Sequence, residues 1–274
     1  MWINELTPED SNIQETLKTK GKLPQHIGII MDGNGRWAES KNLNRLEGHR
    51  MGIESVRDIV KACSQIGIEY LTLYSFSIEN WNRPVEEVNG LMLLLEYYLR
   101  KEVDELHKNK VRIKTIGKTN SLPMSVQTLL YEAIEKTRKN TGLTMTLALS
   151  YSGRWDIVRA VQLLALDARS GKLSPEDINE KLFSSYLTTK DLPDVDLLIR
   201  TSGELRLSNF MLWEMAYGEF FITEKYWPDF RRNDLYDAIN SFMLRERRFG
   251  KTSKQIRTHN FAPNYSNTGK TNES

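Results

Sequence analysis

A carboxylate, two glycines and an arginine directly follow an apolar run near the start of the chain. The run Ile27–Met31 stops at Asp32, after which come Gly33, Asn34, Gly35 and Arg36. A carboxylate binds hard cations such as Mg²⁺, glycine amides approach phosphate closely, and arginine offers phosphate oxygens a planar fork of donors. The spacing therefore predicts a site for a diphosphate and a metal ion. Taken alone, the same residues also fit a glycine turn, because Asp-Gly and Asn-Gly are common turn dipeptides.

A second polar segment follows the aromatic and apolar run Tyr70–Phe76. It places hydroxyl, carboxylate, amide, indole and guanidinium groups close together in Ser77, Glu79, Asn80, Trp81 and Arg83. A purely structural alternative packs Trp81 beneath the loop and leaves Glu79 in solvent. Asn80 and Arg83 are the residues here that favour ligand binding.

Two arginines and several hydroxyl groups follow the mostly apolar run Val195–Ile199. Arg200, Arg206 and Ser208 lie in this third segment. Arginine suits phosphate oxygens, and serine adds a neutral donor. The alternative is an ordinary charged loop in which Glu204 pairs with one arginine, but the excess of arginine favours an anion site.

Glu219 interrupts a fourth, aromatic segment at Ala216–Phe221. Because a buried carboxylate needs a cationic partner or a metal, Glu219 is a second candidate metal ligand beside Asp32. Arg45 and His49 lie shortly after the first segment, although a lone histidine is more often a surface or capping residue.

Composition describes an ordinary globular chain of 274 residues, with 39% hydrophobic and 27% charged residues. The formal net charge is +2, and residues 245–274 hold seven Lys or Arg against two Glu, so the rest is net acidic. That balance argues against nucleic acid as a partner. A single cysteine, Cys63, excludes an internal disulfide and fits a reducing compartment. No run approaches the ~20 apolar residues of a membrane span, and the N-terminus lacks signal-peptide features. We expect a cytoplasmic protein, peripheral at the inner membrane surface.

Hydrophobic periodicity predicts strands that alternate with helices. Strands are expected at 27–31, 70–76, 111–116, 143–151, 195–199 and 219–223. Helices are expected at 54–64, 85–107 and 155–169, with others capped by Ser121, Ser174 and Asn233. This order predicts a single α/β layered domain with a central, mainly parallel sheet flanked by helices, and ligands beyond the carboxyl ends of the strands. We divide the chain into a polar lead-in at 1–22, a main domain at 23–250 and a polar, basic, disordered tail at 251–274.

Together the four segments resemble the cis-prenyltransferase family over roughly residues 23–250. The resemblance rests on IIMDGNGRWA, GH, FSIENWNRP, DLLIRTSGELRLSNFMLW and AYGEFFITEKYWPDF. Prenyl-chain synthases of the trans class use paired DDxxD motifs, and this sequence has none. Two departures, Gly218 where alanine is usual and Met211 where leucine is common, touch no charged position.

The resemblance implies a Mg²⁺-dependent transferase that adds isopentenyl diphosphate in cis to an allylic diphosphate such as farnesyl diphosphate. Asp32 would be the central catalytic residue and a ligand of Mg²⁺, with Glu219 as the second ligand. Arg200, Arg206 and Ser208 would hold isopentenyl diphosphate. The allylic substrate and the closing loop would involve Gly33, Asn34, Gly35, Arg36, Trp37, Arg45, His49, Ser77, Glu79, Asn80, Trp81 and Arg83. Asn80, His49 or a diphosphate oxygen are alternative proton acceptors.

The resemblance further implies a homodimer, with Arg245–Gly250 similar to the family's C-terminal signature. Its product would be a long polyprenyl diphosphate such as undecaprenyl diphosphate, a lipid-carrier precursor for bacterial cell-wall synthesis, delivered to the membrane. The growing chain needs an apolar tunnel, for which the stripe from Val88 to Val103, with Leu147 and Leu149, is a candidate; simple core packing is the alternative.

Two other functions fit parts of the sequence. A non-catalytic partner subunit would share the fold, but the full set of Asp, Asn and Arg residues argues against it. A nucleotide phosphotransferase would need a phosphate loop, and the G-x-x-x-x-G-K-[ST] pattern is missing from the first segment.

Overall fold

The computed structural model describes residues 6–247 and contains a six-stranded sheet in the order β3-β4-β2-β1-β5-β6. Every neighbouring pair of strands is parallel. The predicted α/β class with a parallel sheet is confirmed. The strands are β1 (His26–Ile30), β2 (Tyr70–Ser77), β3 (Arg112–Ile116), β4 (Thr144–Tyr151), β5 (Leu197–Thr201) and β6 (Glu219–Thr223).

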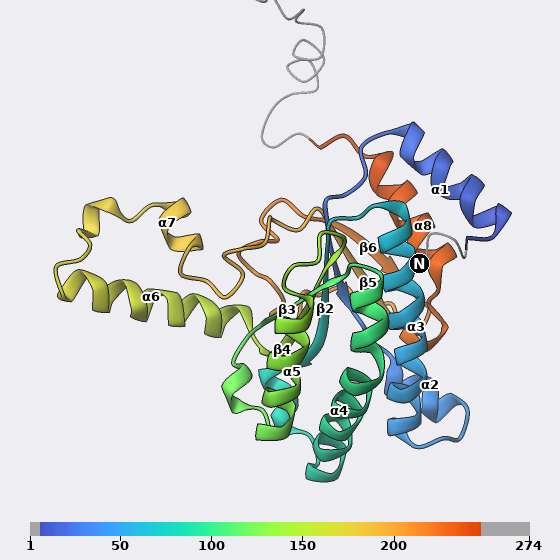
Figure 1. Cartoon of the computed structure of the whole chain (residues 1–274), viewed down its shortest axis with the longest axis horizontal. Coiled ribbons are helices and arrows are strands. Elements are labelled where there is room, and N and C mark those ends of the chain that lie inside the picture. Colours follow the sequence, from blue (N-terminus) through green and yellow to red (C-terminus); the bar gives the residue numbers. More distant parts are fainter. Residues whose placement is uncertain (1–5, 248–274) are drawn as a thin grey trace, which may run out of the picture. The chain divides into compact units, whose positions relative to one another are not determined.

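Helices lie beside the sheet, and α3, α4 and α5 run next to one another along it (Figure 1). The helices are α1 (Pro8–Lys20), α2 (Asn34–Ser40), α3 (Arg45–Ile66), α4 (Val85–Lys108), α5 (Met124–Thr137), α6 (Gly153–Arg169), α7 (Glu180–Ser184) and α8 (Arg232–Met243). Short 3-10 turns are η2 (Ile78–Asn82), η3 (Thr119–Ser121), η4 (Pro175–Asp177) and η5 (Trp227–Asp229). Within the described residues, no helix has the length and apolar character needed to span a membrane.

Both faces of the central strands are covered. All residues of β1, β4 and β5 are buried, as expected for a parallel sheet between two layers. Alternate side chains enter different cores: Ile27 and Ile29 pack with α3, α4 and α8, whereas Ile30 packs with Phe210 and Met211 on the other face. Successive side chains of a strand point to opposite faces of the sheet, so alternate residues of β1 enter the two different cores.

The chain switches direction within the sheet at β1. From β1 it moves to β2 on one side, and β5 later pairs with the other side. In sheets of this kind, ligands bind at such a switch, beyond the carboxyl ends of the strands. Asp32 lies at this switch, two residues after β1 ends.

Several predicted helix starts are wrong. Ser121 ends η3, and α5 begins after Pro123. Ser174 precedes only a 3-10 turn, and Asn179 caps α7 instead, accepting a hydrogen bond from the Leu182 amide at 3.0 Å. Asn233 lies inside α8. Capping residues are abundant in these segments, so packing rather than local chemistry selects which one begins the helix.

The helix predicted at 54–64 begins earlier, at Arg45. Asn44 caps it by accepting a hydrogen bond from the Glu47 amide at 3.0 Å. Its first turns carry polar residues of the site, so the helical spacing of apolar residues on which the prediction depended begins only later in the helix.

The described part of the polar lead-in, from residue 6, contains the packed helix α1. In α1, Gln14 donates a hydrogen bond to Tyr236 at 2.7 Å, and Asp10 forms an ion pair with Arg232 at 3.0 Å. The lead-in helix thus belongs to the same compact unit as the chain up to Met243. The tail predicted at 251–274 lies outside the described residues.

Candidate active site

Asp32 is presented by a tight turn at the end of β1. Gly33 has a φ of 97°, and a Cβ there would lie 2.7 Å from the Tyr226 ring and 2.8 Å from Ser202 Oγ. Only glycine fits this left-handed, crowded position. The Gly33 amide then donates to Asp32 Oδ1 at 2.7 Å, and Thr201 donates to the Asp32 backbone carbonyl at 2.7 Å. The carboxylate is therefore fixed between β1 and β5.

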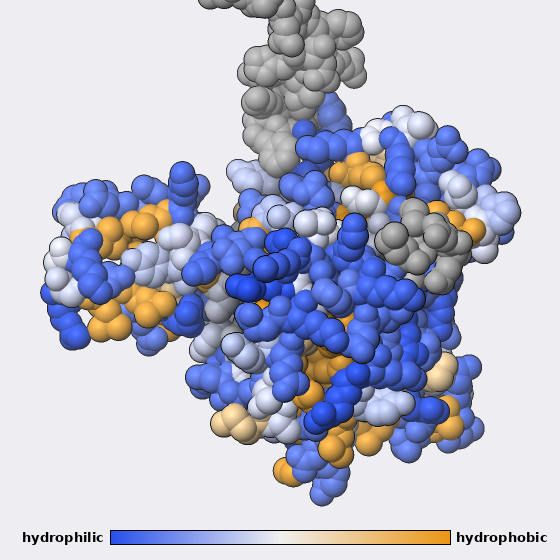
Figure 2. All heavy atoms as spheres, in the orientation of Figure 1, coloured by the Kyte–Doolittle hydropathy of each residue, from blue (hydrophilic) through white to orange (hydrophobic). Residues whose placement is uncertain are grey.

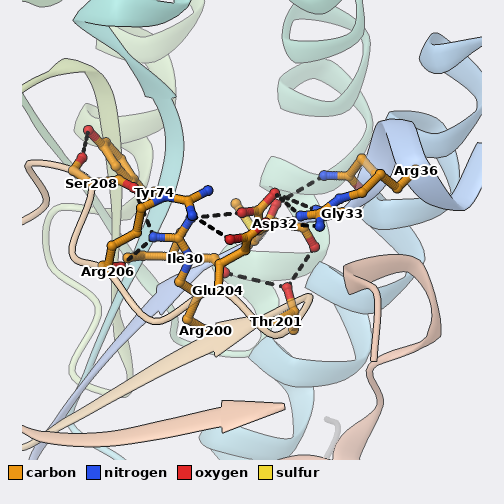
Figure 3. Close-up of polar contacts among 12 residues, drawn as sticks. Ile30, Asp32, Gly33, Arg36, Tyr74, Arg200, Thr201, Glu204, Arg206 and Ser208 are labelled. Carbon is orange, nitrogen blue, oxygen red and sulfur yellow. Dashed lines mark hydrogen bonds and ion pairs between the residues drawn. The ribbon is translucent and has the colours of Figure 1, made fainter. Parts of the chain in front are cut away.

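Arg200 joins the first and third segments. Its side chain is 3% exposed, and Nη2 lies 2.8 Å from Asp32 Oδ2 (Figure 3). Nη1 donates to Ser208 Oγ at 2.8 Å and to the carbonyl of Arg206. A buried guanidinium and a carboxylate from adjacent strands thus form the centre of the site, as the strand order requires.

A second carboxylate, Glu204, bridges two further arginines. It lies 2.9 Å from Arg36 Nη1 and also pairs with Arg206, while Arg36 Nη2 is 3.4 Å from Asp32 Oδ1. Three guanidinium groups thus face two carboxylates, which leaves a local excess of positive charge suited to an anion (Figure 3). Sequence reasoning considered Glu204 as the partner of one arginine; the structure pairs it with two.

Asp32 is ionised in this setting. Burial is the largest single influence and raises the pKa, but the hydrogen bond and charge of Arg200, the Gly33 amide and the charge of Arg36 together lower the pKa of Asp32 below its usual value. Three buried polar atoms close to this cluster have no hydrogen-bond partner: Asn34 Oδ1, Arg200 Nε and Ser202 Oγ. Orphaned polar atoms of this kind are frequent where a polar ligand binds.

The second segment folds as η2 over the third. The Asn80 carboxamide accepts from the Ser77 amide at 3.0 Å, and Asn209 donates to Glu79 at 2.9 Å. Trp81 donates its indole N–H to Ser150 at 2.9 Å and packs edge-on against Phe76. Trp81 therefore supports the loop, whereas Glu79 is exposed to solvent and contacts the third segment through Asn209.

His49 faces the same cavity from α3. Burial, followed by the nearby Arg83 and Arg45 charges, lowers the pKa of His49 to about 4, against the opposing charge of Glu87. The imidazole is therefore neutral at pH 7. Arg83 and Arg45 both pair with Glu87, at 3.1 Å and 3.3 Å, which ties the loop to the start of α3 and α4.

One cavity of about 790 Å³ contains most of the predicted site residues. Those that line its mouth are Asp32, Asn34, His49, Ser77, Glu79, Asn80, Arg83, Arg200 and Ser208. Sequence reasoning assigned no role to several further polar lining residues, among them Arg154 in α6 and Asn209, which directly follows Ser208 in the third segment. Gly33, Gly35, Arg36, Arg45 and Arg206 lie around this group without lining the cavity.

Beyond the mouth the cavity becomes apolar and continues between the sheet and the helices α3 and α4. Its apolar lining includes Val56, Val60, Leu91, Met92, Leu95, Leu99, Val103, Leu106, Ile113, Met145, Leu147 and Leu149. The predicted tunnel stripe and the two β4 residues are confirmed as lining, except Val88, which is buried outside it. The site therefore joins an anion-binding mouth to a long apolar pocket.

Two predicted residues do not reach this site. Trp37 is buried, donates its indole N–H to Asp229 at 2.8 Å and has no contact with the cavity. Glu219 begins β6 and is in register with Leu197 and, through it, with Ile27 at the amino end of β1. At ~3.3 Å per residue, that places Glu219 about 16 Å from Asp32 along the strand direction. Within a single chain, the two carboxylates therefore lie at opposite edges of the sheet, and the role of Glu219 as a metal ligand stays a prediction.

The donors around Asp32 fit a metal ion that is bound together with substrate. Among residues 6–247, no group of three or more His, Cys, Asp or Glu side chains could hold a metal. Mg²⁺ commonly takes only one or two carboxylates and completes its shell with waters and substrate phosphates. Asp32, half-buried and ionised beside a phosphate-type anion site, matches that requirement.

Comparisons with known proteins point to one family. The family model "Putative undecaprenyl diphosphate synthase" matches residues 30–250. An isoprenyl transferase of Chlorobaculum tepidum is 58% identical over 252 residues, covering 92% of this chain and 95% of that protein. The farnesyl-diphosphate-specific ditrans,polycis-undecaprenyl-diphosphate synthase of Aliivibrio fischeri is 49% identical over 90% of this chain and 96% of its own. The crystal structure of lavandulyl diphosphate synthase from Lavandula x intermedia, in complex with dimethylallyl diphosphate, aligns with a TM-score of 0.82 at 39% identity, over 84% of this chain and 99% of that one.

Proposed function

The chain belongs to the undecaprenyl diphosphate synthase family, and from that premise we propose that it condenses isopentenyl diphosphate in cis onto farnesyl diphosphate to make a long-chain polyprenyl diphosphate. The observation that carries this proposal is the cluster of Arg36, Arg200 and Arg206 around Asp32, at the mouth of an apolar cavity of about 790 Å³. The cationic mouth suits two diphosphates, and the apolar part suits a hydrocarbon chain.

The two substrates would bind at adjacent strand ends. We assign isopentenyl diphosphate to Arg200 and Ser208 after β5, and the allylic diphosphate to Asn34 and Arg36 after β1. The 2.8 Å pair between Asp32 and Arg200 joins these two positions. Holding the attacking double bond and the allylic carbon side by side supplies much of the acceleration through proximity and orientation.

The arginines would also stabilise the diphosphate that leaves the allylic carbon. Preformed positive charge at that position lowers the barrier without reorganisation during the reaction. Asp32 and the substrate phosphates would hold Mg²⁺, which when bound supplies further charge neutralisation. The lowered pKa of Asp32 keeps the carboxylate available for this role at neutral pH.

A proton must leave the condensed carbon. The Asn80 carboxamide is not a base and already accepts from Ser77. The pKa of His49 is lowered to about 4, which makes its imidazole a weak acceptor. A diphosphate oxygen of the substrate carries negative charge and can accept a proton, so we assign the proton to that oxygen, with Asn80 and His49 as positioning residues.

We further propose that two copies associate, and that the product passes from a cytoplasmic, peripherally bound enzyme to the membrane as a precursor for cell-wall synthesis. Apolar side chains gather over α6 and α7 (Figure 2), including Val158 and Val161, which are 55% and 52% exposed. Exposed apolar patches of this kind mark protein contacts. Light scattering of the purified chain tests the dimer directly.

Incubation of the purified chain with farnesyl diphosphate, isopentenyl diphosphate and Mg²⁺, followed by mass spectrometry, tests the activity. We expect a series of polyprenyl diphosphates and no product after chelation with EDTA. Absence of product with the chain alone would instead favour a partner subunit, and tight ATP binding would favour a phosphotransferase. Equal turnover in EDTA would refute the proposed role of Mg²⁺.

A further inference from the structure

One charged pair lies deep in the wall of the apolar cavity. Five of the seven charged residues that line the cavity gather at its mouth: Asp32, Glu79, Arg83, Arg154 and Arg200. The other two, Arg57 on α3 and Glu102 on α4, face the hydrocarbon part. Charges beside a pocket for an apolar chain call for an explanation, because an aliphatic lining would bind that chain better.

The pair bridges the two helices. Arg57 Nε lies 3.0 Å from Glu102 Oε1, and Nη2 bonds the same oxygen. The Arg57 guanidinium also lies 2.5 Å from Glu54 and 5.3 Å from the Tyr98 ring centroid. The side chains of Arg57 and Glu102 are 28% and 25% exposed, so the pair spans from the cavity to solvent. It therefore closes the seam between α3 and α4.

A second bridge crosses the same seam at the mouth, where Arg45 pairs with Glu87 at 3.3 Å. Arg45 and Arg57 are about 18 Å apart along α3 at 1.5 Å per residue. Between the bridges the cavity wall is formed by half-buried apolar side chains on both helices: Ile53, Val56, Leu91, Leu94, Leu95 and Tyr98. The seam is thus an apolar slot with a charged bridge at each end.

The far end of the cavity is closed. Leu106, Ile113 and Met145 line it there and are 8%, 1% and 5% exposed, packed within the main core. Ile113 and Met145 are paired at the amino ends of β3 and β4, opposite the mouth. A chain that grows from the mouth can therefore leave sideways, through the slot, more easily than through this packed end.

We propose that the Arg57–Glu102 bridge is a lateral gate that sets the length of the polyprenyl product. This inference rests on the proposed function. A growing chain that reaches the bridge must part α3 from α4 to extend further, and the ion pair resists that movement. Products accumulate near the length at which the tail meets the bridge. Weakening the bridge then gives longer chains.

Glu102→Gln is the sharpest test. Arg57 keeps its contact with Glu54 in this variant, so no isolated buried charge is left behind. We expect the product distribution at matched turnover to shift by at least one isoprene unit towards longer chains. The swapped pair Arg57→Glu/Glu102→Arg should return the distribution towards that of the wild type, because the cross-helix attraction is restored.

A matched control removes an ion pair elsewhere on α3. Glu47 lies 2.7 Å from Arg50, and neither residue lines the cavity. Glu47→Gln should leave the distribution unchanged, and thermal unfolding of each variant checks that it is folded. Unchanged or shorter products from folded Glu102→Gln would overturn the gate. Failure of the wild type to make any product would instead refute the proposed function, so the two failures are distinguishable.

Discussion

Replacing Asp32 separates its structural contribution from its chemical one. Asp32→Ala removes the partner of Arg200, which is only 3% exposed. Breaking a buried pair costs about 3–5 kcal/mol. Here Asp32 is 28% exposed, and Arg200 keeps Ser208 and the Arg206 carbonyl. We therefore expect a smaller loss of about 1–3 kcal/mol, or roughly 3–10 °C in the unfolding temperature of a domain of this size.

Asp32→Asn keeps an oxygen for the Gly33 amide and a neutral acceptor for Arg200. We expect it to lose less than about 1 kcal/mol of stability, within the range of one weakened hydrogen bond. The charge that attracts a metal ion is nevertheless lost. Both variants should therefore lose condensation by at least about 10²–10³-fold, the usual effect of removing one electrostatic group from an active site.

The assay is incorporation of labelled isopentenyl diphosphate at saturating substrates, with thermal unfolding measured on the same preparations. Asp229→Asn is the control, since this carboxylate accepts from Trp37 at 2.8 Å and does not line the cavity. It should retain wild-type turnover. Turnover near the wild-type value in folded Asp32→Asn would refute the assignment. If the loss of turnover in each Asp32 variant were proportional to its loss of stability, the role of Asp32 would be structural only.

Three further outcomes follow from the geometry. Arg200→Lys should raise the KM for isopentenyl diphosphate by about 10–100-fold, because a point charge replaces the planar fork and one charged hydrogen bond is worth ≈ 1.5–3 kcal/mol; an unchanged KM would contradict it. Gly48→Ala should destabilise the fold by about 1–3 kcal/mol, because the new Cβ would lie 2.0 Å from the Asn34 carbonyl oxygen. Calorimetry measures the unfolding temperature, and an unaltered value would disprove the close packing. Burial lowers the pKa of both His26 and His49 from 6.5 to about 4 in the folded protein. Between these two pH values the unfolded chain binds more protons than the folded one, so the free energy of unfolding should fall as the pH drops from about 6.5 to 4. An NMR titration that finds either imidazole charged near pH 6 would reject this.

Much of the site was predictable because its residues are contiguous in sequence. Asp32 and Arg36 follow one strand, and Arg200 and Ser208 follow another, so local patterns identified each group. The alternation of strands and helices then placed those strand ends at one edge of the sheet. Glu219 begins β6, as the strand predicted at 219–223 requires, so within one chain it lies at the edge of the sheet opposite Asp32.

Packing across long sequence separations was beyond local patterns. Arg45 gave the same signal as Arg36, yet it pairs with Glu39 and Glu87 and not with the carboxylates of the Asp32 cluster. Glu204 was considered as the partner of one arginine, yet it bridges two, Arg36 and Arg206. Such pairings depend on loop conformation and strand register, which neighbouring residue types do not specify.

The sequence by itself determined which chemical groups stand at the strand ends, and therefore which kinds of ligand we propose for them. It also determined the α/β class, because hydrophobic periodicity reflects which faces must be buried. Only the tertiary structure decided which of those groups converge, where the apolar cavity runs and how it is closed between α3 and α4. The physical reason is that a side chain's type is local, whereas its burial, its partners and the space beside it arise from elements brought together by folding.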